Sequence, residues 1–99
     1  MEKAEIEGLW THIHWLSVLE EQGTYTAAAA RLGVSKSAVS QRISDLEKAT
    51  GTRLVTRTTR SVRLTDAGLS LTREVRSAYA QIARSFSSVR DSVGEIRGL

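Results

Sequence analysis

The sequence predicts a mainly α-helical domain with a small β-hairpin, and three observations lead to this fold class. Two short helical segments are joined by a tight turn that contains glycine, which is typical of a helix-turn-helix. A strand-like segment with a polar break follows at residues 52–65. Apolar residues then recur at steps of three and four up to residue 93. We therefore expect a winged helix-turn-helix at 1–64, a long linker helix at 65–93 and a tail at 94–99.

The first two helices are expected at residues 9–22 and 27–32. Gly23 is expected to end the first helix, and Thr26 is expected to cap the second. The four consecutive alanines of the second helix favour helix formation and close packing. Gly33 then ends the second helix with a tight turn. The apolar residues of the first helix recur at steps of three: they are Trp10, Ile13, Leu16 and Leu19.

A third helix is expected over residues 36–49, with Ser35 as its cap and Gly51 at its end. At about 100° per residue, its apolar residues fall within about 60° of one another and form a buried stripe. They are Val39, Ile43 and Leu46. The opposite face is polar, short-chained and nearly free of acid, which favours base reading over an ordinary solvent face. It comprises Ser37, Gln41, Ser44 and Lys48, with Ser40 on its flank.

Residues 52–65 are expected to form the hairpin, or wing. β-Branched and aliphatic residues dominate the segment, and a polar break separates its two strand-like runs. Arg57 and Arg60 lie at or beside the predicted tip, where arginine would meet phosphates or enter the minor groove. For Arg53 and Arg63, a plain surface position is as plausible as a DNA contact.

The last helix begins at Thr65 as a cap, with Asp66 in the first turn. Its apolar stripe spans about 40 Å at 1.5 Å per residue, more than the short upstream domain can cover. A second copy of the same helix is the simplest partner for the uncovered part. The alternative, packing on the chain's own core, applies to Leu71 and Val75 only. The stripe comprises Leu71, Val75, Ala78, Ile82, Phe86, Val89 and Val93.

Charge and composition agree with a nucleic-acid partner. Residues 1–30 carry one basic and five acidic residues, whereas residues 31–63 carry eight basic and two acidic residues. Such a basic third is typical of phosphate binding, although a solvated basic face is the alternative. The 99 residues make one domain, and the absence of cysteine excludes thiolate metal sites and fits a reducing cytosol, so we expect a cytoplasmic protein. The acidic N-terminus has no long apolar run, and we predict neither a signal peptide nor a membrane partner.

The ordered motifs resemble a known family. They are Gly23-Thr24-Tyr25-Thr26-Ala27-Ala28, Arg31-Leu32-Gly33-Val34-Ser35, Ala38-Val39-Ser40, Ile43, Leu46-Glu47, Gly51-Thr52-Arg53-Leu54, Arg57 and Leu64-Thr65-Asp66-Ala67-Gly68. In order and spacing, this set resembles the N-terminal DNA-binding domain of LysR-type transcriptional regulators. Gly94-Glu95-Ile96-Arg97 resembles the point where that family's chain enters its effector-binding domain. We therefore expect a DNA-binding fragment of such a bacterial regulator, the alternative being a stand-alone regulator.

The resemblance implies that the third helix enters the major groove and that the linker helix pairs antiparallel with its mate. By position, base contacts would fall on Lys36, Ser37, Ser40 and Gln41, of which Lys36 is supplied by the family pattern alone. Phosphate or minor-groove contacts would fall on Thr26, Arg42, Arg57 and Arg60. The dimer interface would comprise Leu71, Val75, Ala78, Ile82, Phe86 and Val89.

One departure from the family pattern concerns the base contacts. The family often has Gln-Pro where this chain has Lys36-Ser37, so the base preference there cannot be borrowed. Lys36 would contact either guanine or a phosphate.

The predicted function is sequence-specific binding of double-stranded DNA with dyad-related half-sites by a homodimeric transcription regulator. A small-molecule inducer would act only through a domain absent from this chain. A protein-interaction module with the same shape is one rival, although it should lack the positive field. An enzyme is the other: His12 and His14 diverge on a helix, no nucleophile has a nearby base, and we expect no cofactor and no metal.

Overall fold

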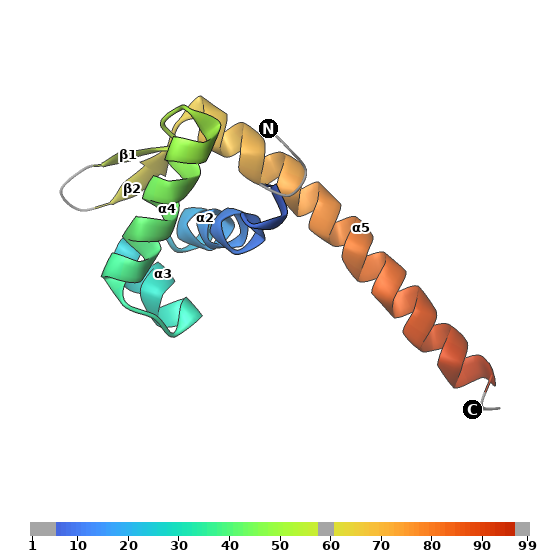
Figure 1. Ribbon diagram of the computed structural model, residues 1–99. Coiled ribbons are helices and arrows are strands. Elements are labelled where there is room, and N and C mark those ends of the chain that lie inside the picture. Colours follow the sequence, from blue (N-terminus) through green and yellow to red (C-terminus); the bar gives the residue numbers. More distant parts are fainter. Residues whose placement is uncertain (1–5, 58–60, 97–99) are drawn as a thin grey trace.

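The computed structural model describes residues 6–57 and 61–96 of the chain, without the side chains of 57 and 94–96. A group of short helices carries a β-hairpin on one side, and a long helix projects away from it on the other (Figure 1). The two strands pair antiparallel, with Val55 opposite Leu64 and Arg57 opposite Val62. In chain order the elements are α2 (Trp10–Gln22), α3 (Tyr25–Leu32), α4 (Lys36–Thr50), β1 (Val55–Arg57), β2 (Val62–Leu64) and α5 (Asp66–Ile96). This architecture confirms the predicted fold class.

Glycines in the left-handed conformation end the three short helices where the sequence indicates. Gly23, Gly33 and Gly51 have φ values of 78°, 71° and 75°, and each follows the last helical turn. Because L side chains rarely adopt this conformation, glycine at these positions lets the chain turn sharply between helices. The tight turn after α3 is therefore what sets α4 across α3 as a helix-turn-helix.

The helix caps agree with the sequence at α4 and differ at α3. Ser35 Oγ accepts a hydrogen bond from Ala38 N at 3.1 Å, as expected. The expectation that Thr26 caps the preceding helix is wrong, because Thr24 is extended and its Oγ1 accepts from Ala27 N at 3.0 Å. The helix thus begins two residues earlier than predicted, at Tyr25, and Thr26 lies exposed in its first turn.

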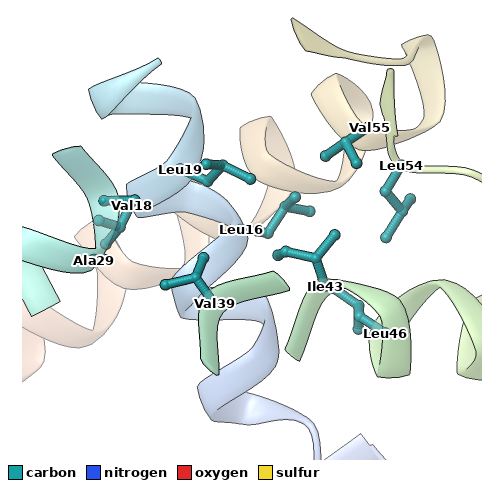
Figure 2. Close-up of a cluster of buried hydrophobic side chains, with 10 residues drawn as sticks. Leu16, Val18, Leu19, Ala29, Val39, Ile43, Leu46, Leu54 and Val55 are labelled. Carbon is teal, nitrogen blue, oxygen red and sulfur yellow. The ribbon is translucent and has the colours of Figure 1, made fainter. Parts of the chain in front are cut away.

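The core forms around α2, which packs against α3, α4 and α5 (Figure 2). Its largest fully buried side chains include Leu16 and Leu19, which meet the stripe of α4. Trp10 belongs to the predicted stripe of α2 but is 56% exposed. Each step of three residues turns the side chain by about 60° backwards, so Trp10 lies about 180° from Leu19 around the helix. The stripe of α4 is buried as predicted: Val39, Ile43 and Leu46 are at most 1% exposed.

Glu47 joins α4 to the wing. Its Oε2 accepts hydrogen bonds from Leu54 N at 2.7 Å and Val55 N at 3.3 Å, in the segment that leads into β1. The side chains of the two donor residues, Leu54 and Val55, belong to the buried core. A backbone N–H that is buried needs a partner, and the carboxylate supplies one for each of these two. The wing therefore starts at a fixed position relative to α4.

The root of α5, meaning its cap Thr65 and its first turn, is hydrogen-bonded to the segment that leads into β1. Thr65 N donates to Leu54 O at 2.9 Å, and Thr65 Oγ1 both donates to Arg53 O at 2.7 Å and accepts from Gly68 N at 3.1 Å. The predicted cap at Thr65 is thus present, with Asp66 in the first turn. Gly68 packs against the Leu54 carbonyl so closely that an added Cβ would clash with that oxygen. Glycine is needed here for close approach between backbones, not for an unusual φ.

The outer part of α5, which follows Tyr79, projects away from the other helices (Figure 1). Near its root, Arg76 Nη2 lies 3.1 Å from Glu20 Oε2, and the Tyr79 ring contacts the His14 ring edge-on. Beyond these contacts the helix extends alone in Figure 1. The helix ends at Ile96, three residues past the end expected for the linker helix. No described helix is both long and apolar enough to cross a membrane.

Candidate nucleic-acid interface

The polar face of α4 is the centre of the candidate site. Burial of the apolar stripe turns the opposite side of the helix outward. Lys36, Ser37 and Gln41 are exposed, while Ser40 is partly exposed at the flank. Lysine, serine and glutamine all have donors or acceptors that match base edges or phosphates. The four predicted base-contact residues therefore lie along one accessible stretch of α4.

Gln41 is held by a neighbour that sequence reasoning missed. Its Nε2 donates a hydrogen bond of 2.8 Å to Asp45 Oδ1, one helical turn along α4. The other carboxylate oxygen of Asp45, Oδ2, lies 3.8 Å from Nε2 of His12 in α2. The signal in the sequence was the spacing of four residues, at which glutamine and aspartate face each other on a helix.

Arg42 is also held in place. Its guanidinium carbon lies 5.1 Å from the centroid of the Trp15 ring, within the range of a cation–π contact. Trp15 itself packs against the core, so the aromatic face that supports the arginine is fixed. Less side-chain entropy remains to be lost when a supported guanidinium meets a phosphate. Arg42 is partly exposed at the side of the α4 face.

The start of α3 is tied to the wing. Val62 N of β2 donates to Gly23 O at 3.0 Å, immediately before the residues that begin α3. Thr26, the predicted phosphate contact in the first turn of α3, is exposed. The hydrogen bond brings this helix start and the loop-side end of β2 into one continuous surface.

The predicted contacts at the wing tip are only partly within the described residues. Arg60 and the side chain of Arg57 lie outside them. Of the two arginines whose role the sequence left open, Arg53 is exposed with its Nε 3.7 Å from Glu47 Oε2, so it joins the link between α4 and the wing. Arg63 is exposed on β2, where its carbonyl accepts a hydrogen bond of 3.1 Å from Thr56 Oγ1.

The chemistry of the described residues is that of binding. Within residues 6–57 and 61–96, no three His, Cys, Asp or Glu side chains are placed to hold a metal ion. His12 is buried and His14 is exposed against Tyr79, so the two imidazoles diverge as their spacing predicts. Exposed serine, glutamine and lysine and partly exposed arginine on one helix are suited to hydrogen bonding and charge pairing with a polyanion.

Known sequences place this arrangement in a family. The family described as bacterial regulatory helix-turn-helix protein, lysR family, matches residues 10–69. The HTH-type transcriptional regulator PtxR of Pseudomonas aeruginosa is 38% identical over 87 residues, covering 88% of this chain and 28% of that protein. The HTH-type transcriptional regulator PgrR of Escherichia coli is 37% identical over 91 residues, covering 92% of this chain and 29% of that protein. The chain thus spans less than a third of the length of these relatives.

Solved structures share the same fold. Full-length LysG of Corynebacterium glutamicum superposes with a TM-score of 0.78 at 29% identity, over 86% of this chain and 29% of that one. The CbnR DBD in its complex with DNA superposes with a TM-score of 0.74 at 28% identity, over 84% of this chain and 95% of that one. The matched residues 10–69 run from the start of α2 to the root of α5. The chain therefore belongs to the LysR family of bacterial regulatory helix-turn-helix proteins, a family of transcriptional regulators and not of enzymes.

Proposed function

We propose that this chain binds double-stranded DNA sequence-specifically as the DNA-binding part of a homodimeric transcription regulator. In this proposal α4 lies in the major groove and the wing contacts the backbone or the minor groove. The observation that carries it is the division of α4 into a fully buried apolar stripe and an exposed polar face. A helix of this kind next to a β-hairpin has the shape with which helix-turn-helix proteins dock on a duplex.

Base-edge contacts are assigned to Lys36, Ser37, Ser40 and Gln41. Gln41 is the best candidate for a specific reader, because an amide offers a donor and an acceptor together. Lys36 stands at the N-terminus of α4, where it would reach either a guanine or a phosphate.

Phosphate contacts are assigned to Thr26, Arg42, Arg57 and Arg60. The supported guanidinium of Arg42 and the exposed hydroxyl of Thr26 favour this role for the two residues whose side chains are described. Contacts of this kind fix the position of the protein on the duplex and carry no sequence information themselves.

Dimerisation is assigned to α5. On its outer part Ile82 is 55%, Phe86 65% and Val89 65% exposed, whereas Leu71 near the root packs on the core. Because these side chains are already partly covered, burial of each would contribute about 1–2 kcal/mol, and an antiparallel second α5 offers a matching stripe. The proposed interface also includes Val75 and Ala78. Two α4 helices related by a two-fold axis would read dyad-related half-sites, and any inducer would act through a domain outside this chain.

Binding to a randomised duplex pool tests the proposal. We expect the protein to enrich a sequence with two related half-sites, and its affinity for any duplex to fall steeply from about 50 to about 200 mM salt. Gln41→Ala should weaken binding to the enriched duplex by about tenfold and binding to a scrambled duplex much less.

Gln81→Ala is the matched control, because Gln81 is an exposed glutamine on α5, outside the surface proposed to meet DNA. Equal losses on the enriched and scrambled duplexes would remove Gln41 as a base reader. A pool that emerges without any enriched sequence would remove sequence-specific binding altogether.

A further inference from the structure

Asp45 is an acidic side chain on the face proposed to meet DNA, and the proposed function gives it no role. A carboxylate there repels phosphates, so its presence is unfavourable for affinity as such. Its side chain is 42% exposed, so Asp45 is not a residue of the buried core. What the carboxylate does do is accept the 2.8 Å hydrogen bond from Gln41 Nε2.

This hydrogen bond decides which way the Gln41 amide points. An ionised carboxylate accepts hydrogen bonds and donates none, so the amide nitrogen, and not the amide oxygen, must face Asp45. The carboxylate is itself oriented, because its second oxygen faces His12 Nε2 at 3.8 Å while the first meets Gln41. His12 is a buried residue of α2, so this partner does not move with the surface of α4.

The oriented amide keeps one N–H and its carbonyl oxygen for a partner outside the protein. Adenine presents an acceptor, N7, beside a donor, the N6 amino group, and matches this pair of groups. Guanine presents two acceptors, N7 and O6, and would place O6 against the amide oxygen. An amide free to rotate would offer both of its N–H groups to guanine, but here one of them is already committed.

We propose that Asp45 is a specificity-determining positioning residue, which holds the Gln41 amide so that α4 prefers adenine over guanine at the base that Gln41 contacts. The inference rests on the proposed function. Asp45 reduces affinity for every duplex through its charge and raises discrimination through its hydrogen bond, as expected of a specificity device.

The experiment compares single-base variants of the duplex that the wild-type chain enriches from a random pool. The position read by Gln41 is the one whose preference disappears in Gln41→Ala. At that position the wild type should bind adenine at least about tenfold more tightly than guanine. Asp45→Ala should reduce this ratio to near one and should bind all duplexes more tightly, because a negative charge is lost.

Asp45→Asn is the charge-matched control. It also removes the charge, so it should raise non-specific affinity as much as Asp45→Ala does, but its amide can either accept a hydrogen bond from Gln41 or donate one to it. The preference for adenine should therefore lie between those of the wild type and Asp45→Ala. In a Gln41→Ala background, Asp45→Ala should leave the base preference unchanged, since the residue it positions is gone.

Three results would overturn the inference: an unchanged adenine-to-guanine ratio in Asp45→Ala, a base preference that Asp45→Ala alters in the Gln41→Ala background, or a guanine preference in the wild type. Each of these leaves sequence-specific binding intact, so it counts against the role of Asp45 alone. If the wild type enriches no sequence, the proposed function fails first and this inference fails with it.

Discussion

Replacement of Glu47 by alanine should destabilise the domain by about 3 kcal/mol. One oxygen of the carboxylate accepts from two backbone N–H groups, at 2.7 and 3.3 Å, and the side chain is only 15% exposed. A hydrogen bond to a charged group contributes about 1.5–3 kcal/mol, so the two bonds together contribute about 3–6 kcal/mol. We take the lower end of this range, because water can reach part of the segment once the side chain is removed.

Thermal unfolding followed by circular dichroism measures this effect. For a domain of this size, 3 kcal/mol lowers Tm by about 12–24 °C. Glu47→Gln keeps an acceptor oxygen and should lose about half as much. Protein concentration must be held constant across variants, since self-association would raise the apparent stability.

Glu74→Ala is the control, because it removes an exposed glutamate on α5 and should shift Tm by no more than about 4 °C. If Glu47→Ala unfolds at the same temperature as this control, the carboxylate does not fix the wing and the reasoning is wrong. The wing would then have to be held by other contacts, among them the β1–β2 pairing, the Thr65 hydrogen bonds and the bond from Val62 N to Gly23 O.

Three further predictions concern the close backbone contact, the proposed dimer and the helix caps. Gly68→Ala should destabilise the domain by about 1–3 kcal/mol in urea unfolding, since the new methyl group forces backbone apart; a wild-type midpoint would contradict the close contact. Phe86→Glu should convert dimers to monomers in sedimentation velocity without lowering the helical content; a dimer of unchanged stability would exclude this face of α5 as the interface. Thr24→Ala should destabilise the domain by about 1 kcal/mol and Thr26→Ala by clearly less, measured by the same urea unfolding; the reverse order would identify Thr26 as the cap.

The local features of the fold could be predicted from the sequence because they depend on short-range chemistry. Gly23, Gly33 and Gly51 end helices through their own φ preference, and the period of Val39, Ile43 and Leu46 fixes the buried side of α4. The exposed polar face of α4 follows directly from that burial. Thr24 and Thr26 show the limit of this reasoning, since both residues are good caps and the composition of the segment does not distinguish them.

The contacts that hold the candidate site together could not be predicted in the same way. Glu47 binds residues seven and eight positions later, and this pairing exists only once α4 and the wing have packed. Gly68 meets a carbonyl fourteen residues earlier for the same reason. Arg42 on Trp15 and Asp45 beside His12 each join α4 to α2. Such pairs depend on the angle between packed helices, which periodicity along a single helix does not specify.

The tight seating of Gly68 has a geometric effect far from that residue. The helix that begins two residues before it, at Asp66, has 31 residues, and at 1.5 Å per residue it is a lever about 45 Å long. Tilting such a lever by about 5° at its fulcrum moves the far tip by about 4 Å, which is close to the rise of one base pair along DNA. In the proposed dimer, the two copies would meet along these levers. The absence of a side chain at Gly68 would thus help set the spacing of the two α4 helices along the duplex.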